Sequence, residues 1–211
     1  LEAAANQQES WLHSPELSLQ FSSFGHMKLV EINTERLWLR EWTEADIPMI
    51  HEMLANPVVE PFHTLPSPLP LEAVKKTLSS AFLDQPKTPR TNYGWSIFSK
   101  ANNQFVGEIG LDGAPERFRS AELFYTIDPA FWRKGIATEA GRAVAKFVFE
   151  VLKFHRLEAG VDTTNSGSIR VLEKIGMRRE GLRRKILPMS DGWRDNYLYA
   201  MLEEDYFMKN F

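Results

Sequence analysis

Cysteine is absent from this sequence of 211 residues. The absence excludes disulfides, thiolate metal sites and a cysteine nucleophile, and it fits a cytoplasmic protein. No apolar run reaches the ~18 residues that a membrane-spanning helix needs. The first residues also lack the basic and then apolar pattern of a signal peptide. We therefore expect a cytoplasmic protein with no membrane partner.

Several ligand-binding signatures are also missing. Neither the G-x-x-x-x-G-K-[ST] phosphate loop nor the G-x-G-x-x-G dinucleotide motif occurs, and the five histidines lack metal-ligand spacing. The net charge of -3 lacks the basic surplus of a nucleic-acid binder. A basic cluster at 178–185 is interpreted as a solvated face. We expect no metal and no nucleic-acid partner.

The length suits one domain with one sizeable core, and the content of 43% hydrophobic and 25% charged residues is ordinary for a globular protein. Residues 1–26 are rich in Ala, Gln and Ser and show no sustained period, and Gly25-His26-Met27 resembles a cloning junction. We interpret 1–26 as a non-native leader, with a native extension as the alternative, and 27–211 as a single domain.

Hydrophobic periodicity predicts a strand, two helices, three strands, a helix, a strand, a helix and two final strands. The predicted strands cover 36–41, 94–99, 105–111, 121–127, 156–161, about 180–188 and about 194–202. The predicted helices begin after Thr43, near Pro70, near Gly135 and after Asn165. Because the middle strands are too closely connected for helical crossovers, the pattern favours a mixed α/β sheet over a doubly wound parallel one.

The segment 128–140 carries the clearest chemical signal. A strand ends, a turn containing Gly135 follows, and an amphipathic helix begins. Free N–H groups and the helix dipole make such a start attractive to anions, and Arg133 and Lys134 add positive charge. The pattern predicts a phosphate or diphosphate site. The alternative is a helix start with solvated basic residues.

Residues 132–137 resemble motif A of the GNAT superfamily, [QR]-x-x-G-x-[GA], with Trp132 in place of the first residue. Further segments resemble the RimJ/RimL branch of that superfamily, and they follow in the family order over roughly residues 33–205. These segments are 34–37, 120–123, 134–140, 155–159, 165–176 and 191–195. Each one is weak alone, but six in order make chance a poor explanation.

The resemblance implies a fold and an activity. The fold is a central mixed, mostly antiparallel, twisted sheet of about seven strands, splayed between its fourth and fifth strands (121–127 and 156–162) and flanked by about four helices. The activity is direct transfer of an acetyl group from acetyl-CoA to a primary amine, either a protein N-terminus or a small amine. Many relatives dimerise, so the resemblance also points to a homodimer.

The resemblance further assigns residues to the CoA site. Pantetheine would lie in the splay and bind the backbone of the fourth strand, and the diphosphate would lie on the amides around the start of the following helix. The matching positions are Tyr125, Thr126 and Ile127 for pantetheine and Arg133, Lys134, Gly135, Ile136, Ala137 and Thr138 for the diphosphate. Asn165 matches a residue that faces the pantetheine arm, and its alternative role is to cap the helix that it precedes.

Two residues are candidates for catalysis. Glu122 is the candidate general base, acting through water, with a salt bridge or a substrate contact as the alternative. Ser168 is the candidate hydrogen-bond donor to the departing thiolate, with a structural role in the first helical turn as the alternative. The tyrosine acid of many superfamily members falls at Leu172 here, which leaves the acid unassigned, and Phe124 replaces the usual glycine before the tyrosine.

A second function class stays open, namely a non-catalytic CoA-binding regulatory module with the same fold. Within the enzyme class, the sequence leaves the acceptor amine undecided. Two proline-rich loops, 57–70 and 84–91, are expected to shape the acceptor side.

Overall fold

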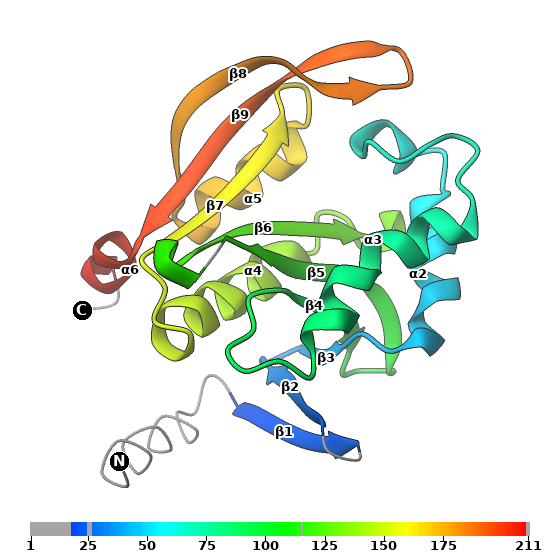
Figure 1. The fold of residues 1–211 in the computed structure, drawn as a ribbon. Coiled ribbons are helices and arrows are strands. Elements are labelled where there is room, and N and C mark those ends of the chain that lie inside the picture. The colour runs from blue at the N-terminus through cyan, green and yellow to red at the C-terminus, as the bar shows by residue number, and fades with distance from the viewer. Residues whose placement is uncertain (1–17, 25–26, 115, 210–211) are drawn as a thin grey trace, which may run out of the picture.

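The computed structural model describes residues 18–24, 27–114 and 116–209. Its centre is one nine-stranded sheet with the strand order β1-β2-β3-β4-β5-β6-β7-β9-β8 (Figure 1). The strands are β1 Ser18–Phe24, β2 Met27–Asn33, β3 Leu37–Glu41, β4 Tyr93–Ser99, β5 Gln104–Gly113, β6 Ser120–Ile127, β7 Arg156–Asp162, β8 Arg178–Met189 and β9 Gly192–Leu202. The β6–β7 pair is parallel, and every other neighbouring pair is antiparallel. The predicted mixed sheet is therefore confirmed.

Helices connect and cover the strands. The α-helices are α2 Ile47–Leu54, α3 Leu71–Asp84, α4 Ile136–Lys146, α5 Ser166–Ile175 and α6 Glu203–Lys209, and a π-helical segment, Phe147–Val151, continues α4. The four predicted helices correspond to α2 to α5, and α6 was not predicted. Among the described residues, no helix combines the length and the apolar character needed to span a membrane.

The sheet has two more strands than the predicted seven. β1 and β2 form a hairpin that pairs over its full length and joins β3 through residues 31–33. β1 lies within residues 1–26, which we interpreted as a leader, and β2 follows it directly. With these two strands included, the predicted fourth and fifth strands are β6 and β7.

Apolar residues form a core on each face of the sheet. One core lies between the sheet and the helices α4 and α5, where Trp95, Val144 and Leu172 are buried. The other core contains Ile50 of α2 and Leu78 of α3. Alternation along the strands separates the two sets, because successive side chains of a strand point to opposite faces.

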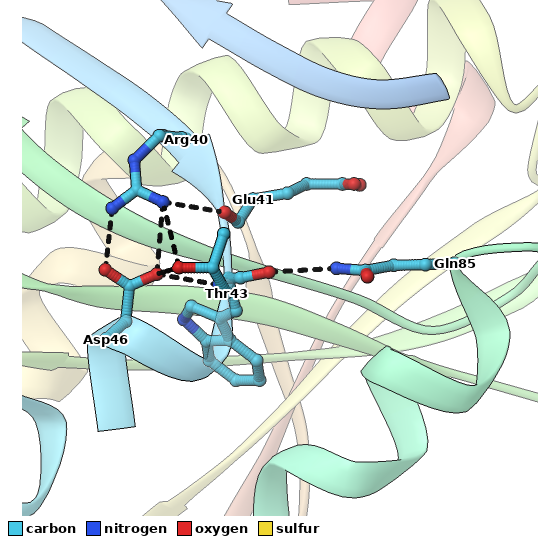
Figure 2. A network of polar contacts seen from close by, with 6 residues as sticks. Arg40, Glu41, Thr43, Asp46 and Gln85 are labelled. Carbon is cyan, nitrogen blue, oxygen red and sulfur yellow. Dashed lines mark hydrogen bonds and ion pairs between the residues drawn. The ribbon is translucent and has the colours of Figure 1, made fainter. Parts of the chain in front are cut away.

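A polar network fixes the start of α2 (Figure 2). The Thr43 N–H donates to the carboxylate of Asp46 at 2.7 Å, within the 3-10 turn Glu44–Asp46 that leads into α2. The guanidinium of Arg40 donates to the same buried carboxylate, with Nη2 2.6 Å from Oδ1. Gln85, just after α3, donates to the Trp42 carbonyl at 3.0 Å. These contacts join α2 and α3 to the end of β3.

β6 and β7 pair only where they begin, and then they part (Figure 1). The paired residues are 120–122 of β6 and 156–158 of β7. Beyond them β6 continues to Ile127 beside β5, and β7 continues to Asp162 beside β9. This divergence is the predicted splay. On the far side of β7, the β8–β9 hairpin has two irregularities of register on the outermost strand, β8.

Candidate active site

One backbone edge of β6 faces the splay. Backbone groups of an antiparallel strand turn alternately to one neighbour and to the other. The Asp128 N–H donates to the Val106 carbonyl and the Ser120 carbonyl accepts from the Ala114 N–H, each at 3.0 Å, so even-numbered residues face β5. The odd-numbered residues that face the splay beyond the paired segment are Leu123, Tyr125 and Ile127.

Two details change the expected contacts of this edge. Thr126 pairs with Glu108 of β5, so its backbone faces β5. We expected the Thr126 backbone to face the splay, but this pairing turns it toward β5. By alternation, the Leu123 backbone faces the splay instead. At Ile127 the carbonyl accepts from the Trp132 indole Nε1 at 2.6 Å, so its N–H is the group left to face the splay.

Backbone amides gather where α4 begins. Gly135 has a φ of +79°, and the first helical hydrogen bond runs from the Glu139 N–H to the Gly135 carbonyl at 3.0 Å. The three amides before Glu139 therefore have no partner within the helix. They belong to Ile136, Ala137 and Thr138, three of the residues predicted for the diphosphate.

The charges around this helix start are mostly positive. Trp132, Arg133, Lys134 and Gly135 are exposed, whereas Ile136 is buried. The helix dipole places partial positive charge here, and Arg133 and Lys134 add two cations. A Cβ added at Gly135 would meet only a guanidinium nitrogen of Arg36, at 3.4 Å, so the space beside this backbone is open. This geometry suits a diphosphate.

The first turn of α5 holds two more predicted residues. The Asn165 Oδ1 accepts from the Ser168 N–H at 3.0 Å, so Asn165 caps the helix. The amide nitrogen of Asn165 takes no part in the cap and can donate to a ligand such as pantetheine. Gly176 follows the helix with a φ of +108°, the left-handed conformation that is common at helix C-termini.

Tyr125 of β6 reaches Ser168 of α5. The Tyr125 hydroxyl lies 2.6 Å from Ser168 Oγ and 3.3 Å from the Ser168 carbonyl oxygen. Burial raises the pKa of Tyr125 to about 12, against the lowering effect of the bond to Ser168. The phenol is therefore neutral at pH 7 and able to donate. Sequence patterns give no sign of this contact, because its residues are 43 positions apart.

Glu122 lies on the other face of the sheet from Tyr125, because three positions along a strand reverse the direction of a side chain. It is exposed, and its register partners are Asp112 of β5 and Glu158 of β7. Glu158 accepts from Arg156 at 2.5 Å, whereas no ion pair joins Glu122 or Asp112 to another described residue. The candidate base and the candidate donor thus approach the splay from opposite faces.

Two aromatic rings, those of Trp42 and Phe124, lie on the α2–α3 face, to which Glu122 also points. A Cβ at Gly110 would lie 2.2 Å from the Phe124 ring, and one at Gly94 would lie 2.1 Å from the Trp42 ring. The two rings are 6.0 Å apart between centroids. Phe124 therefore packs over a glycine of the neighbouring strand, which explains how β6 accepts a large residue where a glycine is usual.

Glu108 and Arg194, which lie on the α2–α3 face or near it, were not among the predicted site residues. Glu108 of β5 is 6% exposed, and burial raises its pKa to about 7 against the lowering effect of a hydrogen bond from Thr126. Arg194 of β9 donates to the Pro61 carbonyl and to Asp162, each at 3.2 Å. Arg194 thereby ties the β8–β9 hairpin to the proline-rich loop 57–70.

Comparison with known proteins identifies the family. A family model described as an acetyltransferase (GNAT) domain matches residues 36–178. The probable N-acetyltransferase YjcK of Bacillus subtilis is 39% identical over 117 residues, which cover 54% of this chain and only 63% of YjcK. The uncharacterized N-acetyltransferase YoaA of the same organism is 30% identical over 176 residues, covering 82% of this chain and 96% of YoaA. The Escherichia coli [ribosomal protein uS5]-alanine N-acetyltransferase is 28% identical over 113 residues, covering 53% of this chain and 58% of that protein.

Solved structures agree. A GNAT-family acetyltransferase from Bacillus anthracis is 30% identical, with a TM-score of 0.67, and the match covers 82% of this chain and 99% of that one. RimJ of Mycobacterium smegmatis, solved in complex with CoA-disulfide, shares the fold at 21% identity with a TM-score of 0.69, covering 82% and 89% of the two chains. The predicted resemblance is confirmed, with RimJ/RimL proteins among the more distant relatives. The chain belongs to the GNAT family of acetyltransferase enzymes.

Proposed function

We propose that this protein transfers an acetyl group from acetyl-CoA directly to a primary amine, either a protein N-terminus or a small amine. The main support is the arrangement of β6, whose unpaired backbone edge leads straight to the amide cluster at the start of α4. An extended ligand arm that ends in a diphosphate fits such an edge. The open space at Gly135 agrees with this fit.

The donor site would use the backbone of β6 and of the α4 start. Leu123, Tyr125 and the Ile127 N–H would bind the pantetheine arm by backbone hydrogen bonds, with Asn165 beside it. The amides from Arg133 to Thr138 would bind the diphosphate, assisted by the helix dipole. The RimJ complex with CoA-disulfide supports a donor of this type.

Acetyl-CoA would supply an acetyl group activated as a thioester. Glu122 would take a proton from the amine through water, from the α2–α3 face. Ser168 would donate a hydrogen bond toward the sulfur from the α5 face. In the net reaction a C–N bond replaces a C–S bond, and one proton passes from nitrogen to sulfur. Side chains on opposite faces of the splay suit a direct transfer between two substrates.

The acceptor would approach from the α2–α3 face, between loop 57–70 and Glu122. The E. coli relative acts on ribosomal protein uS5, and a spermidine N-acetyltransferase chimera shares the fold at 18% identity. Both a peptide N-terminus and a small amine therefore stay within the proposal. We also propose that residues 27–211 form the functional domain in the cytoplasm, as a homodimer that needs no metal ion.

The test is acetyl-CoA turnover, followed by release of free thiol, against polyamines, amino sugars and short peptides with varied N-termini. Release stimulated by one acceptor class would support the proposal and identify that class. Calorimetric binding of CoA without release from any acceptor would instead favour the non-catalytic module. Turnover that is unchanged by a chelator would support the expectation that no metal is needed.

A further inference from the structure

Two sequence segments of the GNAT resemblance, 34–37 and 134–140, are joined in the structure by Glu139. Its Oε1 accepts from the Thr34 hydroxyl at 2.6 Å and from the Arg36 N–H at 3.0 Å. Its Oε2 accepts from the Arg36 Nε at 2.6 Å and lies 2.6 Å from Nη2. The turn before β3 is thereby bonded to the first turn of α4, although more than 100 residues separate the two segments in the sequence.

Arg36 also reaches the loop that precedes α4. Its Nη1 donates to the Lys134 carbonyl at 3.0 Å. In a planar trans peptide the C=O and the next N–H point in opposite directions. The bond to the Lys134 carbonyl therefore fixes the direction of the Gly135 N–H, which is one of the amides assigned to the diphosphate. Gly135 itself is in the left-handed region with a φ of +79°.

The pairing of Glu139 with Arg36 affects the binding of an anionic ligand, because Glu139 is itself negatively charged. A carboxylate in the first turn of α4 would repel a diphosphate bound at the same place. Burial alone would raise the pKa of Glu139, but the bonds from Thr34 and Arg36 outweigh burial and hold the pKa below its ordinary value. Glu139 is therefore ionised at pH 7, and the paired Arg36 balances its charge.

We propose that Arg36 is a positioning residue for the donor: it fixes the Lys134–Gly135 peptide, neutralises Glu139, and so gives the site its affinity for the diphosphate of CoA. This inference rests on the proposed function, because it assumes that the α4 start binds the diphosphate. The Arg36 side chain is about half exposed, so it is also accessible to a ligand bound at that place.

The test compares CoA with pantetheine, which lacks the diphosphate, by calorimetry on the full chain. The Kd of CoA should rise about tenfold in Arg36→Ala, since a charge-assisted hydrogen bond and a charge balance are lost. The Kd of pantetheine should stay within twofold. Adding Glu139→Gln to Arg36→Ala should recover part of the CoA affinity, because the unbalanced carboxylate is removed. Arg36→Lys, which keeps the charge without the forked contacts, should fall between the wild type and Arg36→Ala.

Arg142→Ala is the matched control, because Arg142 lies on the same helix and donates to the Lys174 carbonyl at 3.0 Å, away from the amide cluster. It should leave the Kd of CoA unchanged. An Arg36→Ala protein that binds CoA like the wild type, or that loses CoA and pantetheine affinity equally, would overturn the role of Arg36. A wild-type protein that binds CoA no better than pantetheine would instead overturn the diphosphate site itself, and with it the basis of the proposal.

Discussion

The hydroxyl groups of Tyr125 and Ser168 lie 2.6 Å apart, and they join β6 to α5 at the level of the splay. If the phenol donates to Ser168 Oγ, the serine proton is free to point elsewhere. The pair thus offers an account of the acid that the sequence leaves unassigned, since Ser168 would donate while Tyr125 holds it in place. The raised pKa of Tyr125 agrees with a neutral donor.

A double-mutant cycle tests this pair. Ser168→Ala should lower kcat about tenfold or more, by the loss of a hydrogen bond at the leaving group, and Tyr125→Phe should lower it by a smaller factor. Because the two hydroxyls act as a unit, the double variant should be no slower than Ser168→Ala. Independent, multiplying effects would contradict the pairing. The Kd of CoA in each variant is the control for donor binding.

Glu122→Gln should lower kcat by about 100-fold or more if Glu122 is the general base. Asp112→Asn is the matched control, because Asp112 is the register neighbour of Glu122 on β5 and carries no proposed role. Its kcat should stay within a few fold of wild type. Equal losses in the two variants would indicate that the negative charge on this face attracts the acceptor and that neither residue is a base.

Gly135→Glu should abolish measurable CoA binding, because a carboxylate would occupy the place assigned to the diphosphate. Gly135→Ala separates charge from backbone strain. The positive φ makes any side chain unfavourable there by about 1 kcal/mol, but the space is open, so CoA binding should persist. A folded Gly135→Glu protein with wild-type affinity, checked by circular dichroism and calorimetry, would remove the diphosphate assignment.

Glu108 predicts a pH dependence of stability. Its pKa is about 7 in the folded protein against an ordinary 4.5, so the folded state holds the proton more tightly than the unfolded state. The contribution of Glu108 to the free energy of unfolding is therefore complete below pH 4.5, and it is lost as the pH rises to about 7 and above. Glu108→Gln removes this effect and should be more stable than wild type at pH 8, by on the order of 3 kcal/mol. The two proteins should be nearly equal in stability at pH 4.5.

Chemical denaturation of both proteins at pH 4.5 and 8 measures that difference. Glu72→Gln is the control, because the Glu72 side chain on α3 is 78% exposed and its replacement should add no pH-dependent change. A stability difference between Glu108→Gln and wild type that is the same at both pH values would contradict the buried, protonated state of Glu108.

Arg194→Ala should raise the KM for the acceptor several fold and leave the Kd of CoA within twofold. The reason is that Arg194 holds loop 57–70 through the Pro61 carbonyl, and this loop belongs to the proposed acceptor side. Steady-state kinetics with the acceptor class found in the turnover screen would measure the effect. A matching loss of CoA affinity would show instead that Arg194 supports the splay as a whole.

The sequence predicts features that depend on local spacing. Hydrophobic periodicity located β6, and Asn165 marked the start of α5, because caps and periodicity act within a few residues. The sequence does not show which residues of β6 turn their N–H and C=O groups to the splay, since this depends on the register of β6 with β5. For that reason Thr126 was expected at the splay and Leu123 was not. The β1–β2 hairpin precedes the first clear strand signal and was missed as well.

Contacts between distant segments were also beyond a single sequence. Tyr125 with Ser168, Arg36 with Glu139, and Arg194 with Pro61 each join elements that only the folded chain brings together. Glu108 lies in a strand that is buried on both faces from Val106 to Leu111, and nothing local in the sequence shows this burial. The strand β6 and the start of α4, which carry the proposed CoA site, were thus predictable, whereas the side-chain contacts that orient them were not.

The position of β8 at the end of the sheet gives the basic cluster at 178–185 a structural meaning. An outermost strand offers unpaired backbone groups to other chains, and proteins commonly prevent such intermolecular pairing with charged side chains, bulges and proline. β8 has all three: Arg178 to Lys185 supply five cations, two register irregularities interrupt its ladder, and Pro188 lies near its end. The same features that make β8 irregular therefore protect the protein from aggregation through this edge.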